Sequence, residues 1–231
     1  MPNRKAPPRA APSPDSAVVA RTLRESAAAL GVRLDPDAAG RLVDFGRELL
    51  RWNARVDLVA PTDLATFARR HLLDALALLP LLRDLGVRRL IDLGSGAGLP
   101  GLVLALVEPG LTVESLEPRS RRAAFQRHVT RLFGLGGVRV TEARAERGGP
   151  PPVPPADAAV ARAVAPLPDL VALAAPLARP GGVVLAMHGP ADSAESAAAA
   201  AAAAGLVLER EHAYTLPGDD RDGPRSRTVL V

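Results

Sequence analysis

The sequence of 231 residues contains no cysteine. This absence excludes a disulfide scaffold, an iron–sulfur cluster, a thiolate zinc site and a cysteine nucleophile. Aromatic residues are also scarce, with one Trp and one Tyr, which argues against a platform of stacked rings for single-stranded nucleic acid. The four histidines lack metal-ligand spacing, so we expect no metal site.

Long apolar runs are missing as well. No stretch approaches the roughly 20 apolar residues of a membrane span. The first 14 residues carry charge but no apolar central region, so they do not form a secretory signal. We therefore expect a cytoplasmic protein without membrane contact.

Positive charge comes almost entirely from arginine, because Lys5 is the only lysine. The net charge is +4 and the isoelectric point is near 10.7, which favours a polyanionic partner. The abundance of Ala, Arg, Pro and Gly is equally typical of a biased coding sequence. The basic character is therefore only weak support for RNA binding.

The length suits one α/β domain with a small helical addition. Residues 1–14 are rich in proline, so we expect a disordered tail. Residues 15–85 form a predicted N-terminal helical cap. Its helices are expected from an Asp15-Ser16 N-cap to residue 30, from Asp35-Pro36 to about 53, and from 62 to about 82 with a potential break near His71.

Strands and helices alternate in residues 86–231. This pattern predicts a doubly wound, mostly parallel sheet whose ligand lies at the carboxyl ends of the strands. The expected strands are 89–93, 111–116, 138–142, 158–162, 183–188 and a closing antiparallel pair, 206–214 with 227–231. The expected helices are 99–107, 120–133, 167–177 and the alanine run 197–204, which Gly205 ends.

A glycine loop follows the first expected strand, from Asp92 to Gly101. Its spacing is G-x-G-x-G at residues 94, 96 and 98, whereas the dinucleotide fingerprint is G-x-G-x-x-G and Leu99 stands where that pattern continues. An acid directly before the loop suits a cationic ligand, such as a sulfonium amino acid, better than a pyrophosphate. The loop therefore favours S-adenosylmethionine over a dinucleotide.

Glu117 ends the next expected strand, where a carboxylate can accept both ribose hydroxyls of a nucleoside. Ala145 and Glu146 follow the third strand, where backbone atoms could read an adenine edge, although an ordinary strand–loop junction has the same appearance. Together with the glycine loop, these residues predict an S-adenosylmethionine site.

The segment after the fourth strand limits the chemistry. Methyltransferases that act on base amines usually have Asn/Asp-Pro-Pro-aromatic there, but this chain has Ala161-Arg162-Ala163-Val164. Methylation at pyrimidine C5 needs a cysteine. Methylation at guanine N7 needs no general base, because the N7 lone pair is free. Catalysis then requires only the alignment of N7, the methyl carbon and the sulfur, and the stabilisation of a cation. The sequence permits this reaction, and a non-catalytic binder would have the same features.

Several segments in order resemble the RsmG (GidB) family of bacterial small-subunit ribosomal RNA guanine-N7 methyltransferases over roughly residues 16–231. They are Arg51-Trp52-Asn53, Arg70-His71-Leu72-Leu73-Asp74, Asp92 to Gly101 with its Leu-Pro-Gly ending, Glu117-Pro118 with Arg121-Arg122, Ala145-Glu146 and Ala161-Arg162-Ala163. The resemblance implies a Rossmann-like class I methyltransferase fold with S-adenosylmethionine as cofactor. It also implies 16S rRNA as substrate, at guanine 527 and presented on small-subunit particles.

The combined site prediction has three parts. The cofactor residues are expected to be Asp92, Gly94, Ser95, Gly96, Gly98, Leu99, Glu117, Ala145, Glu146 and Arg162. The candidates beside the base, implied by the resemblance, are His71, Arg162 and His188, with Asp74 lining the cleft. Arg121 and Arg122 are expected to contact RNA phosphates, although a solvated helix face explains them equally well.

Two departures from the family affect the expected RNA contacts. Asp57-Leu58-Val59 replaces Asn-Leu-Thr, and Met187-His188-Gly189 replaces Leu-Lys-Gly, so that a mostly neutral histidine stands for a lysine. A small-molecule methyltransferase and a non-catalytic nucleotide-binding module remain alternatives. We expect a monomer.

Overall fold

The computed structural model describes residues 14–231 except 163, 189–193 and 219–222. The expected disordered tail therefore lies outside the described residues, apart from Pro14. Helix α1 (Pro14–Ala29) begins at this proline, so the predicted start at Asp15-Ser16 is wrong by a residue or two. The fixed φ of proline suits the first turn of a helix, which explains the earlier start.

The cap consists of α1, α2 (Pro36–Asn53) and a chain of short helices. As predicted, Asp35 is the N-cap of α2, where its carboxylate accepts a hydrogen bond from the Ala38 N–H at 2.7 Å. The third helix is interrupted near His71 by a π-helical turn, which widens the helix without breaking it. Its parts are α3 (Leu64–Phe67), η1 (Ala68–Leu72), α4 (Leu73–Leu76) and α5 (Leu78–Asp84).

The strands of the described residues form one seven-stranded sheet in the order β3-β2-β1-β4-β5-β7-β6. The first five in this order pair in parallel, and β7 is antiparallel to β5 and β6, which confirms the doubly wound, mostly parallel prediction. The strands are β1 (Arg89–Leu93), β2 (Thr112–Leu116), β3 (Val138–Thr141), β4 (Ala156–Arg162), β5 (Ala178–His188), β6 (Glu211–Leu216) and β7 (Arg225–Leu230).

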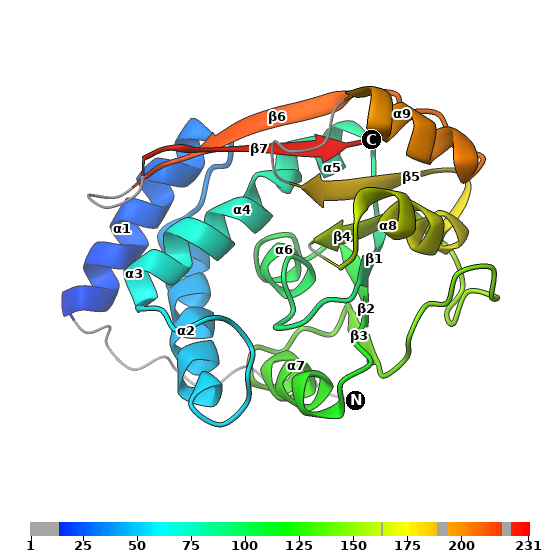
Figure 1. Ribbon diagram of the computed structural model, residues 1–231. Helices are drawn as coiled ribbons and strands as arrows, with labels where there is room; N and C mark the ends of the chain where they lie inside the picture. Colours follow the sequence, from blue (N-terminus) through cyan, green and yellow to red (C-terminus); the bar gives the residue numbers. More distant parts are fainter. Residues whose placement is uncertain (1–13, 163, 189–193, 219–222) are drawn as a thin grey trace.

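Helices cover both faces of the sheet (Figure 1). On β1, Leu90 packs into the apolar core shared with the cap, whereas Ile91 and Leu93 pack into the core on the opposite face, where α8 and α9 lie. Burial on both faces explains why the consecutive residues Leu90 and Ile91 of β1 are both apolar. The remaining helices are α6 (Gly101–Val107), α7 (Ser120–Leu132), α8 (Leu167–Ala174), η2 (Ala175–Leu177) and α9 (Ala194–Ala203).

Several element boundaries differ from the sequence prediction. Strand β5 begins at Ala178 instead of residue 183, and α9 begins at Ala194 instead of residue 197. Helix α6 begins at Gly101 instead of residue 99, with Pro100 as its N-cap, because the glycine loop extends that far. The closing hairpin is confirmed, but β6 begins at Glu211 instead of residue 206. In the described residues no helix is both long enough and apolar enough to cross a bilayer.

The chain order reverses between β1 and β4, which are neighbours in the sheet although β2 and β3 separate them in sequence. In doubly wound sheets such a switch point opens a crevice at the carboxyl ends of the strands. The glycine loop, Glu117 and Arg162 all lie at these ends.

Candidate cofactor and substrate site

The three glycines of the loop have left-handed backbones, with φ of +64° at Gly94, +57° at Gly96 and +81° at Gly98. A Cβ added at Gly94 or Gly98 would lie within 2.8 Å of Val164 or 2.3 Å of Leu102, respectively. At Gly96 the nearest atom would be Arg122 Nη1, at 3.8 Å. Gly94 and Gly98 therefore permit close packing of the protein itself, whereas at Gly96 a Cβ would make only ordinary van der Waals contacts.

A buried polar cluster supports the loop from beneath. Ser95, Ser115 and Gln126 are at most 2% exposed. The Gln126 amide donates to Ser95 Oγ and to the Gly96 carbonyl, both at 2.8 Å, and Ser115 Oγ lies 2.6 Å from Ser95 Oγ. These contacts hold the loop in position before any ligand binds.

Glu117 lies against the same loop and is only 3% exposed. Its Oε2 accepts a hydrogen bond from the Gly96 N–H at 2.8 Å, and its Oε1 accepts one from the Arg119 N–H at 2.8 Å. An ionised carboxylate has about four acceptor positions, so acceptor capacity remains for other donors. Glu117 thus lies directly beside Gly96.

Asp92 is fully buried at the base of the loop. Its Oδ2 accepts a hydrogen bond from the Gly101 N–H at 2.7 Å, whereas its Oδ1 has no hydrogen-bond partner in the described part of the chain. Burial raises the pKa of the Asp92 carboxyl to about 7, although the Gly101 hydrogen bond opposes this shift. Asp92 therefore joins the two ends of the loop, and its buried Oδ1 has no partner among the described residues.

A second cluster joins the cap to the sheet. Arg162 Nη1, at the end of β4, contacts Asp74 Oδ2 at 3.0 Å and His71 Nδ1 at 3.4 Å. The Tyr214 hydroxyl donates to Asp74 Oδ1 at 2.7 Å, and Arg227 Nε lies 3.8 Å from the same oxygen. The structure therefore brings the predicted residues His71, Asp74 and Arg162 together.

Protonation in this second cluster follows from burial and charge. Burial, together with the positive charge of Arg162, lowers the pKa of His71 to about 4. Burial and the Asp74 carboxylate raise the pKa of Tyr214 far above its usual value. At neutral pH His71 is therefore neutral and Tyr214 protonated, while Arg162 and Asp74 form an ion pair.

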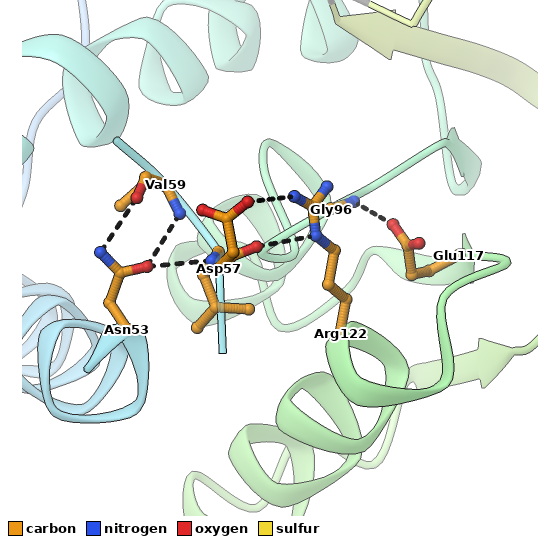
Figure 2. A network of polar contacts seen from close by, with 7 residues as sticks. Asn53, Asp57, Val59, Gly96, Glu117 and Arg122 are labelled. Carbon is orange, nitrogen blue, oxygen red and sulfur yellow. Dashed lines mark hydrogen bonds and ion pairs between the residues drawn. The ribbon is translucent and has the colours of Figure 1, made fainter. Parts of the chain in front are cut away.

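The loop of residues 54–59, between α2 and α3, lies beside the glycine loop. The Asn53 amide donates to the Val59 carbonyl at 2.9 Å, and its Oδ1 accepts from the N–H groups of Leu58 and Val59 at 2.9 and 3.0 Å. From the other side, Arg122 Nε donates to the Asp57 carbonyl at 3.0 Å. Figure 2 shows Asp57 between these two side chains, with Glu117 directed at Gly96.

The sequence has relatives among known proteins. The family model described as "rRNA small subunit methyltransferase G" (GidB) matches residues 39–221. The chain belongs to the GidB family. A relative named "Ribosomal RNA small subunit methyltransferase G" from Myxococcus xanthus is 42% identical over 82% of this chain and 87% of its own length. A second with the same name, from Azoarcus, is 38% identical over 87% of this chain and 91% of its own length.

Solved structures agree on the fold of this GidB-family chain. The O-methyltransferase TomG from Streptomyces achromogenes, solved in complex with SAM, is 18% identical, with a TM-score of 0.54 over 91% of this chain and 95% of that one. An O-methyltransferase from Klebsiella pneumoniae, described as putative in its title, is 18% identical, with a TM-score of 0.53 over 94% and 96%. Both have the Rossmann-like class I methyltransferase fold found here.

The structure describes most of the other predicted site residues of the GidB-family chain. Leu99 is buried, Ala145 is half-buried and Glu146 is exposed. His188 ends β5, directly after Met187, which pairs with Arg162. Arg121 is exposed on α7. Ala163 and Gly189 lie outside the described residues.

Arg122 has a position that the sequence did not indicate. Its side chain is 23% exposed, and its hydrogen bond connects α7 to the 54–59 loop. The departure at Asp57 affects this connection little, because the bond uses the Asp57 carbonyl, while the Asp57 carboxylate lies 3.9 Å from Arg122 Nη2.

Sequence reasoning missed two polar residues of the GidB-family site, Gln126 and Tyr214. Each is the only residue of its type in the chain, and each is hydrogen-bonded to a predicted site residue. Gln126 follows the buried Phe125 on α7, so a polar residue beside a core position was the available signal.

Proposed function

We propose that this chain transfers a methyl group from S-adenosylmethionine to N7 of a guanine in 16S rRNA, guanine 527 by the family resemblance. Its GidB-family relatives are named as ribosomal RNA small subunit methyltransferases, which supports rRNA as substrate. The observation that carries the proposal is the glycine loop itself, in which Gly96 is uncrowded by other side chains and donates its N–H to the carboxylate of Glu117.

The residues at this loop suit S-adenosylmethionine. Glu117 has acceptor capacity left for ribose hydroxyls, and the Asp92 carboxyl, buried beneath the loop with Oδ1 unpaired, favours a positive charge nearby. Gly96 leaves room for close approach of the ligand to the backbone. Ala145 and Glu146 are the proposed contacts of the adenine ring. When bound, S-adenosylmethionine supplies an electrophilic methyl group.

The charge state of the second cluster supports N7 as the acceptor atom. Attack by the N7 lone pair releases no proton, so the reaction needs no general base. His71, with a pKa of about 4, is a weak base, and Tyr214 stays protonated. Arg162 is held by Asp74 and has further N–H donors, and arginine commonly contacts the O6 edge of guanine. We assign to Arg162 the orientation of the base.

Labelled methyl transfer tests the proposal. Small-subunit particles, and naked 16S rRNA, from cells that lack the gene are incubated with the protein and S-adenosylmethionine labelled in its methyl group. We expect label in 16S rRNA that is recovered as 7-methylguanine, and much slower labelling by a Glu117→Gln variant when S-adenosylmethionine is limiting. Label on an exocyclic amine, or only in small molecules, would contradict the proposal.

A further inference from the structure

A separate cavity of about 460 Å³ lies where the end of α2 meets α7. Ligand pockets typically measure about 300–1,000 Å³, so the cavity is large enough for a small molecule or one nucleotide. None of its lining residues belongs to the cofactor and substrate site. They are Arg51, Trp52, Ala54, Arg55, Val56 and His128, and we call this cavity the tryptophan pocket.

The aromatic wall of the tryptophan pocket is fixed by one carboxylate. Glu48 Oε1 accepts a hydrogen bond from Trp52 Nε1 at 2.9 Å and lies 2.6 Å from His128 Nε2. The Trp52 and His128 ring centroids are 5.1 Å apart, and Trp52 also packs on Phe125 at 5.6 Å. Because Glu48 contacts both the Trp52 and the His128 rings, the wall is already formed without a ligand.

The rim of the tryptophan pocket is positively charged. The Arg51 side chain is 70% exposed, and Arg55 is also exposed. Two acids lie nearby. The Glu48 side chain is 12% exposed and is already hydrogen-bonded to Arg51, Trp52 and His128, whereas the exposed Asp57, which follows Val56, lies 3.9 Å from Arg122 Nη2. Aromatic surface below an arginine rim matches a planar base with an attached phosphate.

The location relates the tryptophan pocket to the substrate site. His128 follows Arg122 by six residues on α7, which is about 9 Å along a helix. Val56, in the pocket lining, directly precedes Asp57, which Arg122 contacts beside the glycine loop. One RNA strand can therefore place its target base at the methyl donor and a nearby nucleotide at the pocket.

We propose that the tryptophan pocket binds one unpaired nucleotide of the RNA substrate, with the base against Trp52 and the phosphate at Arg51 and Arg55. The identity of that RNA as the methylated substrate rests on the proposed function. The scarcity of aromatic residues excludes an extended stacking platform, but a single base needs only one large ring.

Fluorescence tests the pocket directly, because Trp52 is the only tryptophan in the chain. The protein is titrated with an unstructured single-stranded RNA of twelve nucleotides and, separately, with poly-glutamate. We expect saturable quenching by the RNA, which weakens as salt rises. A double variant, Arg51→Ala with Arg55→Ala, should weaken this binding about tenfold, whereas the exposed control Arg21→Ala on α1 should not. Absence of quenching, equal binding by the double variant, or quenching by poly-glutamate alone would overturn the proposal.

Methyl-transfer kinetics separate this proposal from the proposed function. The double variant should raise the KM for 16S rRNA about tenfold and leave kcat and S-adenosylmethionine affinity unchanged. An unchanged KM, with an active wild type, would refute the pocket's role and spare the methyltransferase assignment. If the wild type methylates no RNA but RNA still quenches Trp52 through the two arginines, the proposed function fails while the pocket remains an RNA site.

Discussion

Single substitutions can distinguish the roles of the glycines in the loop. At Gly96 an added methyl group meets no atom within 3.8 Å, so Gly96→Ala costs only the backbone strain at positive φ, about 1–2 kcal/mol, and should still fold. At Gly98 the same methyl group would lie 2.3 Å from Leu102, so Gly98→Ala should lower the melting temperature clearly more. Calorimetry should show that folded Gly96→Ala has lost S-adenosylmethionine binding. Binding retained by Gly96→Ala would move the cofactor elsewhere.

Glu117 tests the ribose contact. Glu117→Gln keeps the shape of the side chain but provides only one carbonyl acceptor, so its NH2 group faces the N–H of either Gly96 or Arg119. We expect S-adenosylmethionine to bind about 10- to 100-fold more weakly, in line with about 1–3 kcal/mol for a lost hydrogen bond to a charged group. Isothermal titration measures this effect, and Glu146→Gln is the exposed control. Equal affinities for the two variants would argue against the assignment.

His71 and Asp92 should give opposing pH dependences of stability. The pKa of His71 falls from 6.5 to about 4 on folding, so its contribution is present above pH 6.5 and is lost as the pH falls towards 4. The pKa of Asp92 rises from 3.8 to about 7, so its contribution is present below pH 4 and is lost as the pH rises towards 7. In His71→Gln the free energy of unfolding should therefore fall from pH 4 to 7, and in Asp92→Asn it should rise from pH 4 to 6.5. Urea titrations at several pH values measure both slopes, and parallel profiles would contradict the assignment.

At the scale of elements, the 54–59 loop depends on one side chain before it. Asn53→Ala removes three hydrogen bonds, to Leu58 and Val59, while α2 itself keeps its backbone contacts. We expect hydrogen exchange to speed up in residues 54–62 and S-adenosylmethionine to dissociate faster, because the loop lies beside Gly96. Exchange mass spectrometry measures the first effect, and Asn53→Asp is the matched variant that keeps one acceptor atom for Leu58 and Val59. Unchanged exchange in Asn53→Ala would show that Arg122 alone positions the loop.

Most elements were predictable because periodicity and turn residues report on local structure. Strand β1 and the glycine loop could be located from Asp92 and the three glycines, and α9 from its alanine run and Gly205. Contacts between distant residues were not predictable, since nothing local relates Tyr214 to Asp74, 140 residues away. The cofactor residues were therefore found with their elements, whereas Gln126, Tyr214 and the role of Arg122 depend on tertiary packing.

At the scale of the whole molecule, one apolar core crosses from the cap to the sheet. Phe45 of α2 packs against Phe67 of α3 and Phe125 of α7, with ring centroids 6.2 and 6.3 Å apart, and the same core reaches Leu90 and Val160. The division into a cap of residues 15–85 and a core of residues 86–231 remains a prediction about the chain. The stability of the cap and the stability of the sheet both depend on this shared core, because neither part buries its apolar face alone.

We therefore expect a single cooperative unfolding transition, with equal calorimetric and van't Hoff enthalpies. Phe45→Ala should lower the free energy of unfolding by about 3–5 kcal/mol, the usual cost of removing a buried ring. Leu170→Ala, in the core on the other face of the sheet, should shift the same transition by about 2–5 kcal/mol. Scanning calorimetry of both variants decides the point. If Phe45→Ala created a separate early transition while the sheet melted at the wild-type temperature, the cap would unfold independently, and the shared core would not couple the two parts.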